Sequence, residues 1–389
     1  PMKSANSLMS SLGTTVFEVM SALAREHKSV NLGQGFPDDK GPDEVRAAAA
    51  EFLLSGHNQY PPMMGIPELR QAVAEHAKRF QGLDVDWQSE VLVTSGATEA
   101  LGDCLFGLVE PGDEVVLIEP LYDSYLPMVR RAGGVPKLVR LEPPTWRLPR
   151  EELAAAFSAK TKLILFNTPM NPCSKVFDRD ELQFIADLCL QYDVYAVCDE
   201  VYEHIIFDDR RHISPMTLPG MRDRTVRIGS AGKSFSLTGW KVGYITAAAD
   251  LMKAIAKTHQ FMTFTTPPNL QWGAATGLRL GDDYFSTLAC DMQRKRDRLA
   301  GALSEIGFDV LPAHGTYFVT TDFRPLGFNG TDEDFCRHIT VEAGVTAVPV
   351  SAFYDRPSDA PRHFARFCFC KHDSTLDSAI QRLAAHFRG

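Results

Sequence analysis

The chain has 389 residues, of which 44% are hydrophobic and 23% charged, a composition typical of a globular protein that buries its own core. The formal net charge of −9, with no dense cluster of Lys and Arg, argues against a nucleic acid as partner. No apolar run approaches the roughly 18 residues that a membrane span needs, and the first residues lack the pattern of a signal peptide. We therefore expect a cytoplasmic protein that binds neither nucleic acid nor membrane.

Eight cysteines are scattered through the chain, most of them inside apolar runs such as Leu188-Cys189-Leu190. None has C-x-x-C spacing, and Cys368 and Cys370 alternate along a predicted strand. Because a buried free thiol behaves as a small hydrophobic group, we expect reduced, buried cysteines and no metal site.

From about residue 90 onward, short apolar runs alternate with helical patterns. The predicted strands are Val91–Thr94, Glu114–Ile118, Lys162–Phe166, Val194–Cys198, Thr225–Ile228 and Gly243–Ala247. Helices are predicted at Thr98–Val109 and Asp178–Gln191, and Asp178 with Glu181 is typical of a capping box. Continuous apolar strands separated by helices indicate an α/β fold, with a parallel or mixed central sheet covered by helices on both faces.

After about residue 285 the pattern changes. A long charged helix is predicted at Phe285–Ile306 and leads into the apolar segment Thr316–Val319. A helix opened by Thr331 with Asp334 follows, then strands near Val345–Val348 and Phe364–Phe369, and a last helix after Asp373. We expect a large domain over residues 45–285. A smaller α+β domain would combine residues 286–389 with the N-terminal residues 1–44.

The sharpest motif is the segment from Ser230 to Gly243, which reads SAGKSFSLTGWKVG. It places Lys233 in a loop of small residues just after a predicted strand, and a second cation, Lys241, just before the next strand. A neighbouring positive charge lowers the pKa of a lysine, which leaves a neutral amine able to attack a carbonyl. We interpret Lys233 as a nucleophilic lysine.

Other polar residues also follow predicted strands. Asp199 ends an apolar strand, with Tyr202 in the turn after it, and a carboxylate at that place suits a cationic ring nitrogen. Asn171 lies in the proline-rich turn NTPMNP, where its amide can donate to a ligand oxygen.

The turn from Thr94 to Glu99 joins a strand to a helix through small residues, and such a helix N-terminus favours an anion. Ligands of parallel sheets bind at the carboxyl ends of the strands, where all these groups fall. A phosphorylated aromatic aldehyde would use every one of them.

These motifs resemble those of class I, fold-type I aminotransferases, which depend on pyridoxal 5'-phosphate (PLP), and the resemblance covers nearly the whole chain. It is closest to bacterial methionine aminotransferases and to kynurenine–oxoglutarate (glutamine) transaminases. Besides the lysine segment, it rests on the residues Leu12–Phe17, Asn31–Asp38, Asn58-Gln59-Tyr60 and Arg366–Phe369.

The resemblance implies a role for each matching residue. Lys233 would be the Schiff-base lysine, and Asp199 would contact the ring nitrogen of PLP. The other implied cofactor contacts are Asn171 and Tyr202 at the ring hydroxyl, Tyr122 on the ring face, and Gly96, Ala97, Thr98, Ser230 and Lys241 around the phosphate. Tyr60 would reach the phosphate of a neighbouring subunit, which implies a homodimer.

The substrate would be held by the same constellation. Arg366 would bind the substrate α-carboxylate, with help from Gly35 and Asn171, because a planar guanidinium suits a bidentate carboxylate. The family turn usually continues Thr-Gly after Asn-Pro, whereas here Cys173-Ser174 follows Pro172, which leaves the geometry of that turn open.

The predicted function is therefore transfer of an amino group from an amino acid to a 2-oxo acid, with ping-pong kinetics. Phe17, Phe36, Tyr60, Tyr122 and the segment Phe261–Thr266 suggest a pocket for methionine, glutamine or aromatic substrates. No second arginine can be placed opposite Arg366, which disfavours a dicarboxylate specialist.

Three alternatives stay open at this point. A cysteine-S-conjugate β-lyase would use the same PLP site. A non-enzymatic PLP-binding regulator would need a DNA-binding module, and about thirty residues precede the Asn31 motif. A nicotinamide-dependent dehydrogenase would share the fold class, but the G-x-G-x-x-G fingerprint is missing.

Overall fold

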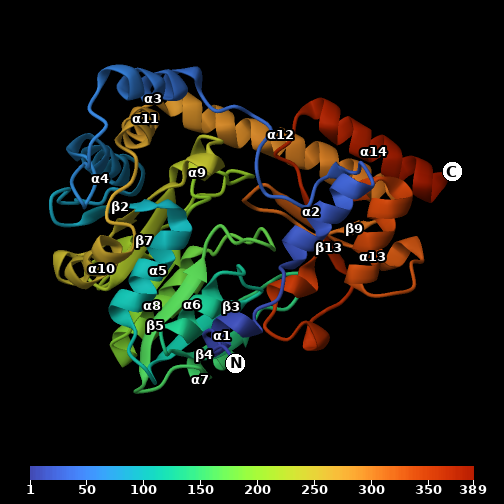
Figure 1. The fold of residues 1–389 in the computed structure, drawn as a ribbon. Coiled ribbons are helices and arrows are strands. Elements are labelled where there is room, and N and C mark those ends of the chain that lie inside the picture. Colours follow the sequence, from blue (N-terminus) through green and yellow to red (C-terminus); the bar gives the residue numbers. More distant parts are fainter.

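The computed structural model describes residues 1–389, apart from the side chain of Ser358. Its main feature is a seven-stranded sheet with the order β2-β8-β7-β6-β5-β3-β4 (Figure 1). Only β8 runs antiparallel to its neighbours. The strands are β2 (Val91–Ser95), β3 (Glu114–Glu119), β4 (Val135–Arg140), β5 (Thr161–Asn167), β6 (Tyr195–Asp199), β7 (Thr225–Ser230) and β8 (Val242–Thr246). The predicted α/β fold with a mostly parallel sheet is therefore confirmed.

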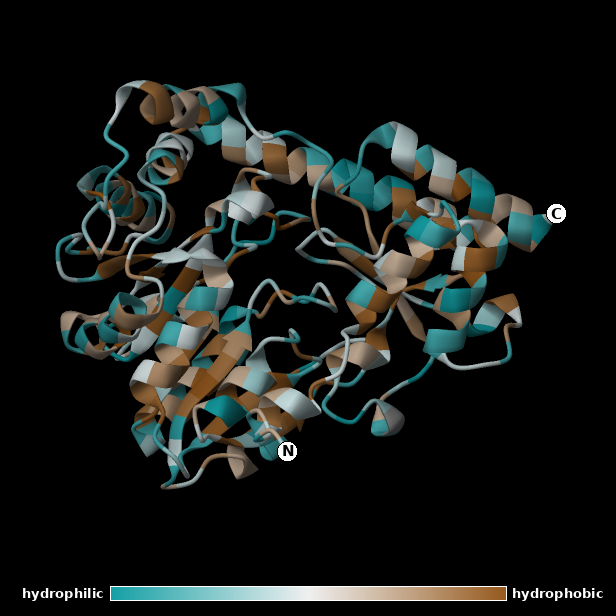
Figure 2. Cartoon of the chain, in the orientation of Figure 1, coloured by the Kyte–Doolittle hydropathy of each residue, from teal (hydrophilic) through white to brown (hydrophobic). Residues whose placement is uncertain are grey.

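Alternate residues of the central strands face two different hydrophobic cores. In β5, Leu163 and Leu165 belong to one core, whereas Ile164 and Phe166 belong to the other. This period of two follows from the pleat of a strand, and burial on both sides explains why the strands are almost continuously apolar in sequence (Figure 2).

Helices cover both faces of this sheet. The first core is completed by α5 (Gly96–Leu108), α6 (Tyr125–Arg131) and α10 (Ala249–Met262). On the other face lie α8 (Arg179–Tyr192) and, toward β2 and β8, α4 (Pro67–Gln81) and α11 (Pro268–Leu278). The remaining helices of this part are α3 (Asp43–Ser55), α7 (Arg150–Ala155) and α9 (Ala231–Ser234).

A smaller sheet has the order β12-β13-β10-β9 and is entirely antiparallel. Its strands are β9 (Asp309–Val310), β10 (Phe318–Asp322), β12 (Val348–Pro349) and β13 (Phe364–Cys368). It packs with α2 (Val16–Glu26), α13 (Asp332–His338) and α14 (Asp373–Arg388), while the long α12 (Asp282–Ile306) runs along the top from α11 to α14 (Figure 1).

The N-terminal segment is connected to this smaller part through a strand pair. After α1 (Ser7–Ser11) and α2, the strand β1 (Val30–Asn31) pairs in parallel with β11 (Val345–Thr346). The predicted domain boundary after residue 285 falls inside α12, and the division into residues 45–285 and the rest stays a prediction.

The capping box predicted at Asp178 is present, and the helix predicted to open at Thr331 begins with a second one. The Asp178 side chain accepts a hydrogen bond from the backbone N–H of Glu181 while the Glu181 side chain accepts one from that of Asp178, and Thr331 with Asp334 does the same at α13. All eight cysteines are free, but Cys290 is exposed because it lies on the outer face of α12, so the expectation that the cysteines are buried fails there. Among the described residues, none of the helices combines the length and apolar character that a bilayer crossing requires.

Candidate active site

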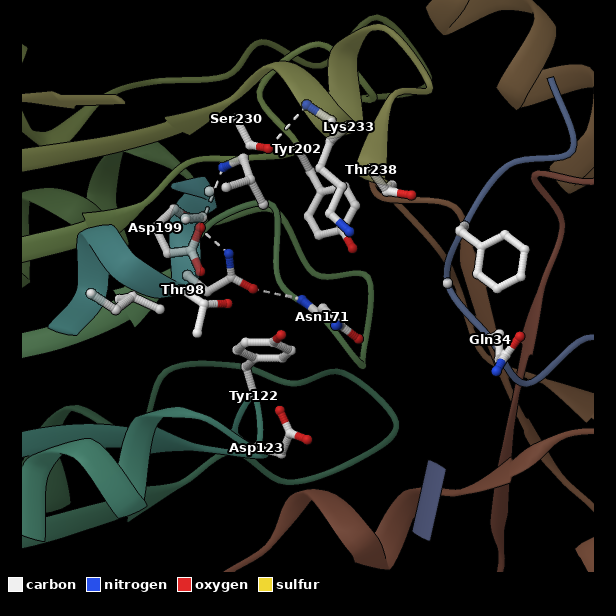
Figure 3. Close-up of a pocket in the computed structure, with 18 of the residues that line it drawn as sticks. Gln34, Thr98, Tyr122, Asp123, Asn171, Asp199, Tyr202, Ser230, Lys233 and Thr238 are labelled. Carbon is white, nitrogen blue, oxygen red and sulfur yellow. Dashed lines mark hydrogen bonds between the residues drawn. The ribbon is translucent and has the colours of Figure 1, made fainter. Parts of the chain in front are cut away.

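A cavity of about 410 Å³ opens at the carboxyl ends of the large sheet, facing the N-terminal segment and the smaller sheet. Tyr60 and the predicted pocket segment Phe261–Thr266 do not line it. The predicted site residues that do are Phe17, Gly35, Phe36, Gly96, Ala97, Thr98, Tyr122, Asn171, Asp199, Tyr202, Ser230, Lys233, Lys241 and Arg366. Figure 3 shows Lys233, Asp199, Asn171 and Tyr122 gathered on one side, with Gln34 across the cavity on the N-terminal segment.

Lys233 lies in α9, a short helix that begins immediately after β7. The Ser230 hydroxyl caps this helix by accepting a hydrogen bond of 3.1 Å from the backbone N–H of Gly232. The Lys233 amine lies 5.6 Å from the centre of the Tyr202 ring and 5.9 Å from that of Tyr317. Burial lowers the pKa of this amine, because a charged ammonium loses its hydration there. The geometry therefore presents a lysine with an increased neutral fraction.

Asp199 is the last residue of β6 and is only 5% exposed. The Tyr125 hydroxyl donates a hydrogen bond of 2.6 Å to its Oδ2 atom. Burial nevertheless raises the pKa of Asp199 to about 6, because the Tyr125 bond offsets only part of the lost hydration. A cationic group placed in the cavity would hold this carboxylate in its charged form.

Arg366 comes from β13 and is 2% exposed. Its Nη1 donates to Oδ1 of Asn171 at 2.5 Å and its Nη2 to the carbonyl oxygen of Gly33 at 2.9 Å. Its guanidinium carbon lies 3.7 Å from the centre of the Phe318 ring. Burial lowers the pKa of Arg366 to about 10, so the group stays charged at neutral pH.

The partners of Arg366 are neutral, and its buried Nε atom has no hydrogen-bond partner among the described residues. A buried charge is stabilised when it is paired, so this guanidinium is suited to an anionic ligand. A carboxylate fits best, because two N–H groups of a guanidinium can bind both of its oxygens.

The first turn of α5 forms the third part of the site. Gly96 has a φ of 75°, and a Cβ atom at this position would lie 2.8 Å from Nζ of Lys241. A Cβ at Gly243 would lie 2.6 Å from the carbonyl carbon of Gly96. Two glycines thus let a helix N-terminus and the Lys241 ammonium approach each other closely, which is an arrangement suited to a small anion such as phosphate.

The unusual turn after Asn171 keeps the conformation that a glycine favours. Ser174 has a φ of 62°, in the left-handed region. Its hydroxyl donates a hydrogen bond of 2.6 Å to the carbonyl oxygen of Phe318 and lies 2.9 Å from the hydroxyl of Thr316. These contacts stabilise the serine in place of glycine and attach the turn to β10.

Several residues of the site carried no signal that sequence reasoning used. Tyr125 contacts Asp199 across 74 residues of chain, and Asn167 joins the site by donating to the Asp199 carbonyl at 2.8 Å and accepting from the Asn171 N–H at 2.8 Å. The cavity is also lined by Thr15, Gln34, Asp123, Thr238 and Phe318. Asn167 opens the proline-rich turn, and Thr15, Gln34 and Thr238 lie inside the motifs quoted above, so membership of those motifs was the available signal.

Tyr60 does not line the cavity of its own chain. Its side chain is 79% exposed and its ring centre lies 5.4 Å from that of Phe264. The position suggested by the resemblance, in the site of a neighbouring subunit, stays a prediction.

Comparison with known proteins places this site in a family. The sequence model of the family described as aminotransferase class I and II matches residues 27–383. The chain is 42% identical to a probable N-succinyldiaminopimelate aminotransferase of Mycobacterium tuberculosis, over 95% of this chain and 96% of that protein. It is 38% identical to a human kynurenine–oxoglutarate transaminase, with 93% of each chain covered.

A solved structure agrees with these relatives. The crystal structure of Escherichia coli YbdL, which identified a methionine aminotransferase function, matches with a TM-score of 0.95 and 39% identity, over 99% of this chain and all of that one. Members of the family use PLP.

The cavity fits that cofactor in three respects: it has a buried amine at Lys233, a buried carboxylate at Asp199, and an anion cradle whose Gly96 leaves no room for a Cβ beside Lys241. The chain belongs to the class I and II aminotransferases and is a PLP-dependent transaminase.

Proposed function

We propose that this transaminase takes the amino group of an apolar, sulfur-containing or aromatic amino acid, of the methionine, glutamine or kynurenine type. It transfers that group to a 2-oxo acid with ping-pong kinetics. The observation that carries the proposal is the pairing of two features in one cavity: the buried guanidinium of Arg366, with neutral partners, and an aromatic wall beside it.

The aromatic wall favours apolar side chains. Phe17 and Phe36 line the cavity from the N-terminal segment and Phe318 from β10. Arg366 lies 5.8 Å from the centre of the Phe17 ring, so a substrate whose carboxylate binds Arg366 would direct its side chain along these rings. Transfer of an apolar side chain from water to such a wall lowers the free energy of binding.

The charges of the cavity point the same way. Among the described residues that line it, the cations are Lys233, Lys241 and Arg366. With Lys233 and Lys241 assigned to the cofactor, Arg366 is left for one substrate carboxylate. A substrate with further carboxylates, as the name of the mycobacterial relative implies for that protein, would find no additional cation in this chain's cavity.

The residues would divide the chemistry among them. Bound PLP supplies an aldehyde that reacts with amines and a ring that withdraws electrons. Lys233 would hold the cofactor through its amine, and the same amine would act as general base and then acid for the proton on the substrate α-carbon. Asp199 would stabilise the positive charge of the ring nitrogen, Asn171 and Tyr202 would bind the ring hydroxyl, and Tyr122 would lie on the ring face. Arg366 orients the substrate.

A second copy of the chain would complete the site. Phe261 and Met262 at the end of α10 are 78% and 70% exposed, and Tyr60 lies against nearby Phe264. Clustered exposed apolar side chains mark interaction surfaces, and we assign this one to a homodimer in which Tyr60 reaches the partner's phosphate site.

Light scattering should give a dimer for the wild type and a shift toward monomer for Phe261→Asp. A monomeric wild type that binds PLP fully would contradict the assignment.

The substrate proposal is tested with a panel of donors and one fixed 2-oxo acid acceptor. Methionine, glutamine, kynurenine and phenylalanine should exceed aspartate and N-succinyldiaminopimelate in kcat/KM by at least about tenfold, the scale of discrimination by a hydrophobic pocket. A donor mixed with the enzyme alone should release oxo acid in an amount stoichiometric with the sites, as ping-pong kinetics requires. Preference for a dicarboxylate donor would overturn the proposal.

A further inference from the structure

Two buried thiols lie in contact beside the substrate-binding arginine. The Sγ atoms of Cys368 and Cys370 are 3.0 Å apart, and the two residues are 0% and 2% exposed. Cys368 is the last residue of β13, and Cys370 lies just beyond the strand. Residues two apart in extended chain project to the same side, which explains why the thiols meet.

The segment that carries these thiols also fixes the wall of the cavity. Arg366 Nη2 donates to the Gly33 carbonyl, and the Lys371 ammonium donates to the Phe36 carbonyl at 2.7 Å. Between them, the backbone N–H of Cys368 donates to Leu32 at 2.7 Å, and the Cys370 carbonyl accepts from the Asp38 N–H at 3.2 Å. The conformation of residues 368–370 therefore affects the position of the Arg366 guanidinium and of the N-terminal segment that faces it.

We propose that Cys368 and Cys370 form an oxidation site at which a hydroperoxide converts the two thiols into an intrachain disulfide. The Cys368 sulfur first attacks the peroxide oxygen, which gives a sulfenic acid and releases an alcohol, or water when the oxidant is hydrogen peroxide. The Cys370 sulfur then attacks the oxidised sulfur, which forms the S–S bond and releases water. The two thiols lose two electrons and two protons, and one hydroperoxide is reduced.

The environment of Cys368 supports its part as the attacking sulfur. Burial alone would raise the pKa of its thiol, but the contact with Cys370 and the nearby charge of Lys371 outweigh burial and lower it. A larger thiolate fraction increases reactivity toward peroxide. Arg366, two residues before Cys368, and Phe36, whose carbonyl oxygen Lys371 contacts, both line the cavity, so the two thiols lie directly behind the wall that a small oxidant would reach.

Closure of the disulfide would disturb the substrate site. Two residues of extended strand span about 6.6–6.8 Å between Cα atoms, the upper limit of what a disulfide tolerates, and the usual separation is about 5.5–6 Å. The segment must therefore shorten by up to about 1 Å, within the stretch that holds Gly33 and Phe36. A misplacement of about 1 Å can reduce turnover on the order of 100-fold.

The PLP-loaded enzyme is treated with hydrogen peroxide, the oxidant is removed, the protein is unfolded in denaturant, and free thiols are alkylated without reduction. The peptide that contains both cysteines is then analysed by mass spectrometry. We expect that peptide to lose two hydrogen atoms and to escape alkylation. Transaminase activity should fall about 10- to 100-fold and return with dithiothreitol. The peptide mass does not depend on which amino acid is the substrate, so this result stands apart from the proposed donor class.

Three variants keep the test sharp. Cys370→Val and Cys370→Ser should be active before treatment and resist the reversible loss, whereas Cys290→Ser, which removes the exposed thiol, should lose activity like the wild type. The proposal is overturned if Cys368 and Cys370 remain alkylatable in peroxide-treated enzyme whose Cys290 is oxidised. It is equally overturned if the Cys370 variants are inactivated, and rescued by dithiothreitol, to the same extent as the wild type.

Discussion

Nη1 of Arg366 donates a hydrogen bond of 2.5 Å to Oδ1 of Asn171, and this contact joins the small antiparallel sheet to the turn that follows β5 of the large one. Asn171 is in turn fixed by the bond from its backbone N–H to Asn167. The proposed substrate carboxylate site and the proposed cofactor site therefore share hydrogen-bonded residues. A substitution in one of the two sites should affect binding at the other.

Arg366→Lys should weaken amino-acid binding while leaving the cofactor in place. Lysine keeps the charge but lacks the planar fork, so it cannot contact Asn171, Gly33 and a carboxylate together. Loss of a charged hydrogen bond costs about 1.5–3 kcal/mol, which corresponds to a rise in KM on the order of 10- to 100-fold, with a smaller change in kcat. Steady-state kinetics measures this effect, and the exposed Arg294→Lys on α12 serves as control. An unchanged KM would contradict the clamp role.

Lys233→Ala should abolish turnover and remove the visible absorption band of the lysine-bound cofactor. Among the described residues that line the cavity, Lys233 and Lys241 are the amines, and Lys241 lies against Gly96 at the start of α5, so the variant loses the amine available for the covalent bond. Activity assays and an absorption spectrum after PLP addition test both effects. Lys257→Ala, an exposed change on α10, should leave activity and spectrum as in the wild type. Retention of the band in Lys233→Ala would assign the covalent bond to another residue.

Much of the fold was predictable because its signals are local. The boxes at Asp178 and Thr331 are each encoded within four residues, and apolar strands such as Val91–Ser95 are visible in a short window. β4 was missed because it is an edge strand whose Val135 is 41% exposed and whose second residue is Pro136. Half-exposed edge strands lose the apolar run that identifies the central ones.

The site was predictable to the extent that its residues belong to motifs at strand ends. The contact between Tyr125 and Asp199 was not predictable from the sequence. Tyr125 belongs to α6, which follows β3, and β3 is separated from β6 by β5, so the contact depends on how α6 packs on the sheet. The exposure of the Tyr60 side chain likewise cannot be explained by contacts within one chain. Contacts between distant segments are set by packing and leave no pattern in a short stretch of sequence.

Asp199→Asn should change how the stability of the cofactor-free enzyme depends on pH. Burial raises the pKa of Asp199 from 3.8 to about 6, so the folded chain binds this proton more tightly than the unfolded chain. The resulting stabilisation is complete below about pH 4 and is lost as the pH rises to about 6, with a total on the order of 3 kcal/mol.

Urea unfolding at about pH 4.5 and about pH 7 measures this dependence. The wild type should lose more free energy of unfolding between the two values than Asp199→Asn, which has no such proton to lose. The exposed Asp283→Asn should behave like the wild type. Equal losses in the wild type and Asp199→Asn would show that Asp199 does not titrate in this range.

Gly96→Ala should weaken PLP binding more than its effect on stability explains. Gly96 has a φ of 75°, where an alanine costs about 1–2 kcal/mol, and the added Cβ would lie 2.8 Å from Nζ of Lys241. Gly82→Ala is a matched control, because Gly82 has a φ of 68° but, among the described residues beyond its chain neighbours, nothing lies within 4 Å of the added Cβ. Both variants should therefore lose a similar stability through the backbone, and only Gly96→Ala should displace Lys241 and raise the Kd for PLP, on the order of tenfold for a loss of about 1.4 kcal/mol. Spectroscopic titration of the cofactor-free proteins measures the Kd, and equal Kd values for the two variants would show that close approach at Gly96 does not serve the anion.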